Sequence, residues 1–85
     1  MNIMVTLNKL KRKNNIISAE YYPEDDKQDC GKLVYDTDKC EVVSYEYCER
    51  DNTSFLKTYL KKAVKAIEKC IEKDDYPETV VYMWY

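Results

Sequence analysis

Residues 54–73 have the sequence SFLKTYLKKAVKAIEKCIEK, and their pattern of apolar side chains decides the fold. At about 100° per residue, the apolar side chains fall within roughly 140° of a helical wheel, the width of a core-facing stripe. They are Leu56, Tyr59, Leu60, Ala63, Val64, Ile67, Cys70 and Ile71. Lysines at positions 57, 61, 62, 65, 69 and 73 occupy the opposite arc with Glu68 and Glu72. The segment is therefore predicted to form one amphipathic helix whose stripe must be covered by a sheet.

The chain before this helix is predicted to form two hairpins. Asn14-Asn15 suits a two-residue turn, because asparagine tolerates positive φ better than any residue except glycine. We therefore expect residues 7–13 to pair with residues 16–22. Apolar residues alternate only weakly over the first seven positions, which leaves open whether residues 1–13 form a strand or a helix.

The second hairpin joins residues 32–35 to residues 42–47. A three-residue loop at positions 38–40 would place Cys40 in the left-handed conformation of a G1 bulge. This register pairs Asp36 with Val42, Tyr35 with Val43, Leu33 with Tyr45, and Cys30 with Cys48. One face then contains Leu33, Tyr35, Val43, Tyr45 and Tyr47, and we expect the helix stripe to pack on the Leu33, Tyr35 and Val43 part of it.

The two ends of the helix are predicted from capping and from proline. Residues 49–53 form a turn into the helix, and the N-cap candidates are Asn52, Thr53 and Ser54. Pro77 cannot continue a helix, so the segment 74–77 ends it.

The last segment, residues 78–85, is rich in β-branched and aromatic side chains and is predicted to form a strand. The order of elements is then β-β-β-β-α-β. Residues 1–85 are expected to form a single α+β domain. Its antiparallel sheet has four or five strands, according to whether the first segment is a strand, and a single helix packs on one face.

Short motifs in the chain resemble small uncharacterised proteins of low-GC Gram-positive bacteria and their phages. The motifs are Tyr21-Tyr22-Pro23, Tyr35-Asp36-Thr37-Asp38 through Glu41-Val42, and Pro77-Glu78 with the ending Met83-Trp84-Tyr85. The similar proteins often have D-x-x-T-G-E at the hairpin, where this chain has Lys39-Cys40 in place of Thr-Gly. The resemblance implies an accessory or inhibitor protein of a phage or mobile element, and it implies no activity for any residue.

The residue types that most often perform catalysis or bind metals are missing or badly spaced. The chain has no histidine, which removes the commonest general base and metal ligand. The cysteines, at positions 30, 40, 48 and 70, include no C-x-x-C pair typical of zinc sites. Asp36 and Asp38 have the spacing that opens a calcium loop, but the later glycine and glutamate are missing. We therefore predict a protein that is not an enzyme and binds no metal or cofactor.

The expected location is the cytoplasm. No apolar run approaches the ~20 residues of a membrane-spanning helix, so we expect no membrane association. The first thirteen residues lack the apolar region of a secretory signal. Cys30 and Cys48 lie opposite each other in the predicted register, within disulfide reach, but in the cytoplasm we expect them to stay reduced.

The lysine arc of the helix is one candidate binding surface. Lys57, Lys61, Lys65 and Lys69 repeat every four residues and could contact the phosphates of a nucleic acid. The net charge of −2 argues against bulk nucleic-acid binding. Lysine also favours a helix on any solvated face, so we keep nucleic-acid binding as the alternative prediction.

The sheet face that one helix leaves uncovered is the other candidate. In the last strand Val80, Tyr82 and Trp84 point one way and Val81, Met83 and Tyr85 the other, and both sets are apolar. Tyrosine, tryptophan and methionine are enriched in interface cores. We therefore predict a non-enzymatic protein that binds a protein partner, or associates with itself as a homodimer. The predicted contact residues are Tyr45, Tyr47, Tyr82 and Trp84, and an acidic loop is the alternative contact surface.

Overall fold

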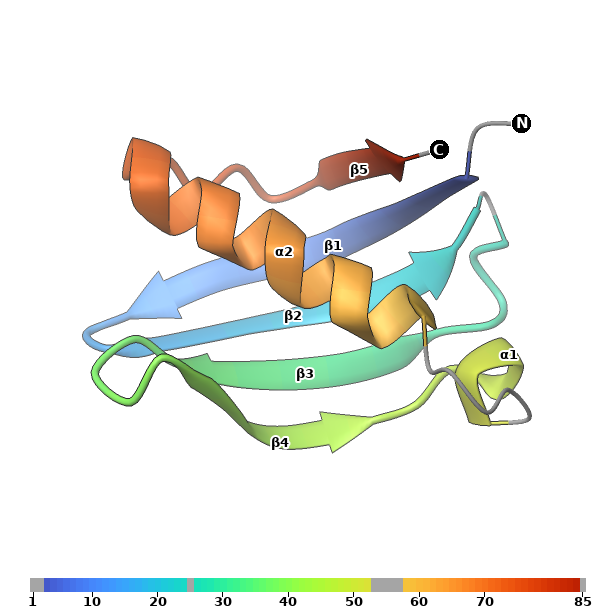
Figure 1. The fold of residues 1–85 in the computed structure, drawn as a ribbon, viewed down its shortest axis with the longest axis horizontal. Coiled ribbons are helices and arrows are strands. Elements are labelled where there is room, and N and C mark those ends of the chain that lie inside the picture. The colour runs from blue at the N-terminus through green and yellow to red at the C-terminus, as the bar shows by residue number, and fades with distance from the viewer. Residues whose placement is uncertain (1–2, 25, 53–57, 85) are drawn as a thin grey trace.

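The computed structural model describes residues 3–24, 26–52 and 58–84. Within these ranges the elements follow the order β1 (Ile3–Lys13), β2 (Ile16–Pro23), β3 (Gly31–Asp36), β4 (Glu41–Glu46), α1 (Glu49–Asn52), α2 (Thr58–Lys73) and β5 (Val80–Trp84). Figure 1 shows α2 lying diagonally across one face of the five-stranded sheet. The predicted α+β fold, an antiparallel sheet with one main helix packed on it, is confirmed.

The sheet has the strand order β4-β3-β2-β1-β5, and every neighbouring pair is antiparallel. The first four strands form a meander in which each strand pairs with the next. α2 then crosses the sheet and brings the chain to the far side of β1, where β5 pairs with it (Figure 1). Residues 3–13 are therefore an inner strand, which answers the question that the sequence left open.

The β1–β2 hairpin has the predicted turn. Lys13 pairs with Ile16, and Asn14 adopts the left-handed conformation with φ of 57°. The strand contains a bulge that the sequence did not predict, because Lys9 also has a positive φ, of 52°, and the register shifts between Asn8 and Lys11. The bulge exposes Lys9 while the next residue, Leu10, is buried in the core.

The β3–β4 hairpin agrees with the prediction only in part. The observed pairs are Lys32–Glu46, Leu33–Tyr45, Val34–Ser44, Tyr35–Val42 and Asp36–Glu41. The pairing of Leu33 with Tyr45 is confirmed. The pairings of Tyr35 with Val43 and of Asp36 with Val42 are wrong, because Val43 is an extra residue in a bulge of β4. As a result Val43, predicted to lie under the helix, is 45% exposed.

The turn of this hairpin is held by Asp36. Its Oδ1 accepts hydrogen bonds from the amides of Asp38 (2.9 Å) and Lys39 (3.2 Å). Burial alone would raise the pKa of Asp36, but these two amides and the side chain of Asn15 hold that pKa below its usual value. Four residues, 37–40, separate the strands instead of the predicted three, and Cys40 has the predicted left-handed conformation with φ of 55°.

The cysteines expected to face each other lie in different surroundings. The β3–β4 pairing stops at Lys32–Glu46, before it reaches Cys30 and Cys48. Cys30 is exposed and Cys48 is buried, and both are free thiols. Partial burial of the Cys30 sulfur and its hydrogen bond to Glu20 raise the pKa of this thiol to about 11.

The core lies between α2 and the sheet. The helix buries Leu60, Ala63, Ala66, Ile67 and Cys70 against Val5, Leu7, Leu10, Ile17, Ala19, Tyr21, Leu33, Tyr35 and Cys48. Ala66 was not in the predicted stripe, whereas Tyr59, Val64 and Ile71 of that stripe are partly buried at its margins. The predicted helix start at residue 54 and the N-cap candidates Thr53 and Ser54 lie outside the described residues, and Asn52 belongs to α1.

The start of α2 is anchored by Asp51, a residue of α1 that is only 1% exposed. Its carboxylate accepts hydrogen bonds from the amides of Tyr59 (3.0 Å) and Leu60 (2.6 Å) in the first turn of α2. The Tyr21 hydroxyl of β2 donates to Asp51 Oδ2 (3.0 Å) and accepts from the Cys48 amide (3.1 Å). Asp51 thus caps α2 from outside the helix and connects it to the sheet.

Gly31 leaves room for this network. A Cβ atom at Gly31 would lie 2.5 Å from Tyr21 Cε1, 2.6 Å from the Glu46 carbonyl oxygen and 2.7 Å from the Cys48 nitrogen. Two of these three atoms belong to the backbone, so the strand itself would have to move. The only glycine of the chain is therefore required here by space.

Asp51→Ala is expected to lower the free energy of unfolding by about 3 kcal/mol. The estimate combines a lost helix cap of about 1 kcal/mol with the cost of leaving the buried Tyr21 hydroxyl without its acceptor, about 1–3 kcal/mol. Urea unfolding at pH 7 measures the change. Asp75→Ala removes an exposed carboxylate and serves as the control, with an effect within about 0.5 kcal/mol. A loss below about 1 kcal/mol for Asp51→Ala would show that the network is not the anchor of α2.

Gly31→Ala is expected to destabilise the protein by about 1–3 kcal/mol, because the added methyl group overpacks the contact with Tyr21 and Cys48. Thermal unfolding of this variant and of Ser44→Ala, at an exposed position of β4, separates the steric effect from a general effect of alanine in a strand. Equal melting temperatures for the two variants would contradict the steric explanation.

Candidate functional site

The strand register assigns every side chain of the sheet to one of two faces. The face opposite α2 contains the cross-strand rows Lys13–Ile16–Asp36–Glu41, Lys11–Ser18–Val34–Ser44 and Asn8–Glu20–Lys32–Glu46. Lys9 adds an ion pair with Glu20 at 3.7 Å. These three rows of the uncovered face are therefore mostly polar.

The polar character of this face ends toward β5. Val81 belongs to a further row, Tyr22–Thr6–Val81, and Met83 pairs with Met4. Val81 is 52% exposed and Met83 is 56% exposed. These two side chains form an exposed apolar strip on the outermost strand of the sheet.

The backbone of β5 forms an open edge beside this strip. Among the strands that the structure describes, β5 pairs only with β1, so the outer edge of β5 has no neighbour. Its sequence, VVYMW, contains no charge, no proline and no glycine. Proteins usually block edge strands with lysine, proline or a bulge. The other edge strand, β4, has such protection in Glu41, Glu46 and the bulge at Val43.

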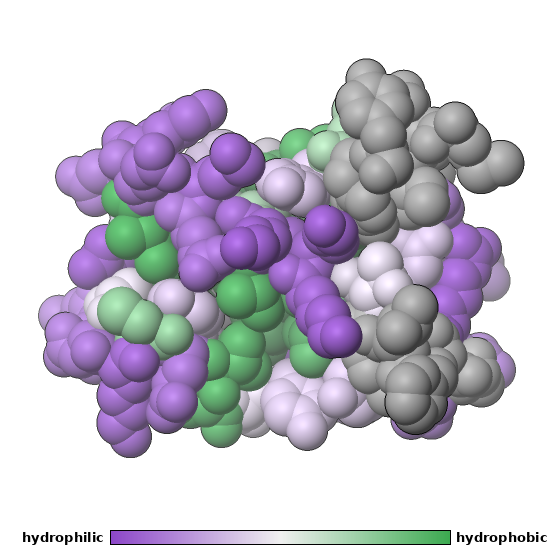
Figure 2. Space-filling model, viewed as in Figure 1, coloured by the Kyte–Doolittle hydropathy of each residue, from purple (hydrophilic) through white to green (hydrophobic). Residues whose placement is uncertain are grey.

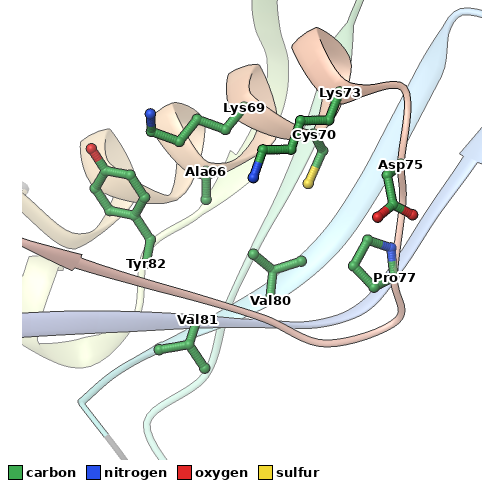
Figure 3. A pocket seen from close by; sticks show the side chains of 9 residues that line it. All are labelled: Ala66, Lys69, Cys70, Lys73, Asp75, Pro77, Val80, Val81 and Tyr82. Atoms are coloured by element: carbon green, nitrogen blue, oxygen red, sulfur yellow. The ribbon is translucent and has the colours of Figure 1, made fainter.

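A pocket of about 190 Å³ lies between this edge and the helix. It is lined by Ala66, Lys69, Cys70 and Lys73 of α2, by Asp75 and Pro77 of the connection, and by Val80, Val81 and Tyr82 of β5. Figure 3 shows the side chains of Lys69 and Lys73 extending from α2 above the strand. The β5 edge therefore has an apolar strip on one side and two ammonium groups on the other.

The thiol of Cys70 in this pocket is not activated. Burial raises the pKa of the Cys70 thiol, and the negative charge of Asp75 adds to the rise, while Lys73 opposes it. Cys70 is accordingly protonated near neutral pH.

The aromatic residues predicted to form one contact surface lie at opposite edges of the sheet. Tyr45 of β4 is 55% exposed, and its ring lies 4.9 Å from that of Tyr47, centroid to centroid. Tyr47 and Tyr82 are partly buried and pack against the core. The backbone of Trp84 pairs with Ile3, and its side chain lies outside the described residues. The prediction that Tyr45 and Tyr82 lie on the uncovered face is wrong, because Tyr45 pairs with Leu33 and Tyr82 with Val5, both core residues on the side of α2.

The lysines of the helix lie on its solvent side. Lys61, Lys65 and Lys69 are exposed, and Lys57 lies outside the described residues. Figure 2 shows hydrophilic residues gathered over α2 on the viewed face. Lys65 is 3.7 Å from Glu68, so its charge is partly compensated within the helix.

Sequence reasoning missed Val81 and Met83 as the exposed pair. The alternation of the last strand did separate them from Val80 and Tyr82, but periodicity alone does not tell which set faces a helix. The pairing of β5 with β1 settles the choice, because Val80 lies opposite Leu7 of the core.

Neither a candidate metal site nor a membrane-spanning helix occurs in the part of the chain that the structure describes. No three or more acidic, cysteine or histidine side chains gather in a way that could hold a metal ion. Neither helix there has the length and apolar character needed to cross a membrane.

No family model, no curated protein and no solved structure matches the chain.

Proposed function

We propose that this chain is a small non-enzymatic binding module that pairs the outer edge of β5 with an extended segment of another protein. The observation that supports the proposal is an unprotected edge strand flanked by Val81 and Met83, both more than half exposed. An added strand gains backbone hydrogen bonds from such an edge, and its side chains gain apolar contacts.

β5 is better suited than β4 to accept an added strand. β4 has exposed apolar side chains at Val43 and Tyr45, but Glu41 and Glu46 lie on the same strand. A bulge also interrupts the regular spacing that a second strand needs. β5 has five regular residues, each paired in register with β1, and no charged side chain.

The cellular setting belongs to the same proposal. The resemblance of the short motifs to proteins of low-GC Gram-positive bacteria and their phages supports an accessory or inhibitor protein of a phage or mobile element. Such a protein would meet its target in the cytoplasm. Self-association through the same edge is the competing form of protein contact.

The proposal is tested with a library of random ten-residue peptides selected against the immobilised protein. Val81→Lys places a charge on the edge and is expected to lower the affinity of the selected peptides by about tenfold. Val43→Lys is the matched control, because it makes the same change at a similarly exposed position on the opposite edge strand, and it is expected to change affinity by less than about twofold. Amide shift changes on binding should be largest at residues 80–84.

Three outcomes would contradict strand addition at β5. In the first, every selected peptide binds the Val81→Lys protein as tightly as it binds the unchanged protein. The shift changes could map to another surface. Sedimentation at micromolar concentration could show a dimer that Val81→Lys converts to monomers, which would assign the edge to a second copy of the chain.

Nucleic-acid binding through the α2 lysines remains the second candidate, because Lys61, Lys65 and Lys69 are exposed along the helix. If each contacts one phosphate, affinity should fall about 40-fold between 50 and 200 mM salt. A fluorescence titration with single- and double-stranded DNA and RNA measures this dependence. Lys61→Glu should weaken the binding more than Lys32→Glu on the opposite face. Absence of binding at 50 mM salt would exclude this candidate.

A further inference from the structure

We infer that the segment that pairs with β5 is acidic, with carboxylate side chains alternating with apolar ones. The inference rests on the proposed strand addition and adds the chemistry of the partner. It follows from the difference between the two sides of the β5 edge, which has apolar side chains on one side and lysines on the other.

Side chains of an added strand point alternately to the two faces of the sheet. On the face away from α2 they would lie beside Val81 and Met83, which are exposed and apolar. On the face of α2 they would lie beside the pocket whose helix side includes Lys69 and Lys73 (Figure 3). A segment that matches both flanks therefore needs apolar residues at every second position and negative charge between them.

The two lysines are available for such a contact. None of the ion pairs in the described part of the chain involves Lys69 or Lys73. Asp75 is the single acid among the residues that line the pocket, so the lining has one more positive than negative charge. Glu68, the residue before Lys69, pairs with Lys65 instead.

Other occupants fit the same edge less well. A basic segment would bring like charges next to Lys69 and Lys73. A second copy of the chain would present another β5, whose sequence VVYMW has no acid to meet these lysines. An acidic segment of another protein is the occupant that the charges favour.

The test uses three capped seven-residue peptides in which valine alternates with glutamate, glutamine or lysine. Binding is measured by fluorescence anisotropy at 20 mM and 300 mM salt. The glutamate peptide is expected to bind about tenfold more tightly than the glutamine peptide at low salt, since two exposed ion pairs are involved, and this difference should shrink at high salt. The lysine peptide should bind most weakly.

Charge reversal identifies the lysines. Lys69→Glu with Lys73→Glu should remove the advantage of the glutamate peptide and transfer it to the lysine peptide. Lys61→Glu makes the same change on the same helix, at a position outside the pocket, and should leave the order of the three peptides unchanged. Circular dichroism confirms that the variants, all at exposed positions, keep their helix.

Failure of this inference is distinguishable from failure of the proposed function. Equal binding of the glutamate and glutamine peptides, with loss of both in Val81→Lys, would overturn the acidic preference and keep strand addition. Unchanged binding of the glutamate peptide to the protein with Lys69→Glu and Lys73→Glu would also overturn the acidic preference and keep strand addition. If none of the three peptides binds, the acidic-segment inference is wrong, and the random library alone then decides whether β5 is a binding edge.

Discussion

The buried carboxylate of Asp51 is the interaction on which the rest of the structure depends. A buried charge is stable only when hydrogen bonds replace the water it has lost. Here the donors come from two elements, the first turn of α2 and the Tyr21 hydroxyl of β2. The carboxylate therefore fixes the start of the helix relative to the sheet, and among the described residues no buried side-chain nitrogen or oxygen lacks a partner.

The crossing of α2 determines where the candidate site lies. The helix begins near the β4 side of the sheet and ends near the other edge, and the chain that follows it joins the sheet beside β1 (Figure 1). That route makes β5 an edge strand and brings Lys69 and Lys73 next to Val80. The open edge and its basic flank are thus consequences of one connection and not two separate features.

The sequence predicts the elements well because their causes are local. Helical periodicity identifies α2, and Asn14-Asn15 identifies the first turn, since both depend on neighbouring residues. It does not predict the bulge at Val43, because one extra residue is tolerated wherever the partner strand permits it. It also misses Asp51 as the cap of α2, because that carboxylate precedes Tyr59 by eight residues and reaches it only through the tertiary fold. Which face of β5 is exposed depends on its neighbours in the sheet, and no pattern within the strand contains that information.

β5 has two roles that its alternation keeps apart. Val80 and Tyr82 pack against the core, while Val81 and Met83 face outward. The core contacts and the pairing with β1 hold the strand in an extended conformation before any partner arrives. The conformational entropy lost on strand addition would therefore fall mainly on the incoming segment. An extended segment gains most from an edge that is already ordered, which makes β5 better suited to recognise a flexible peptide than a second folded surface.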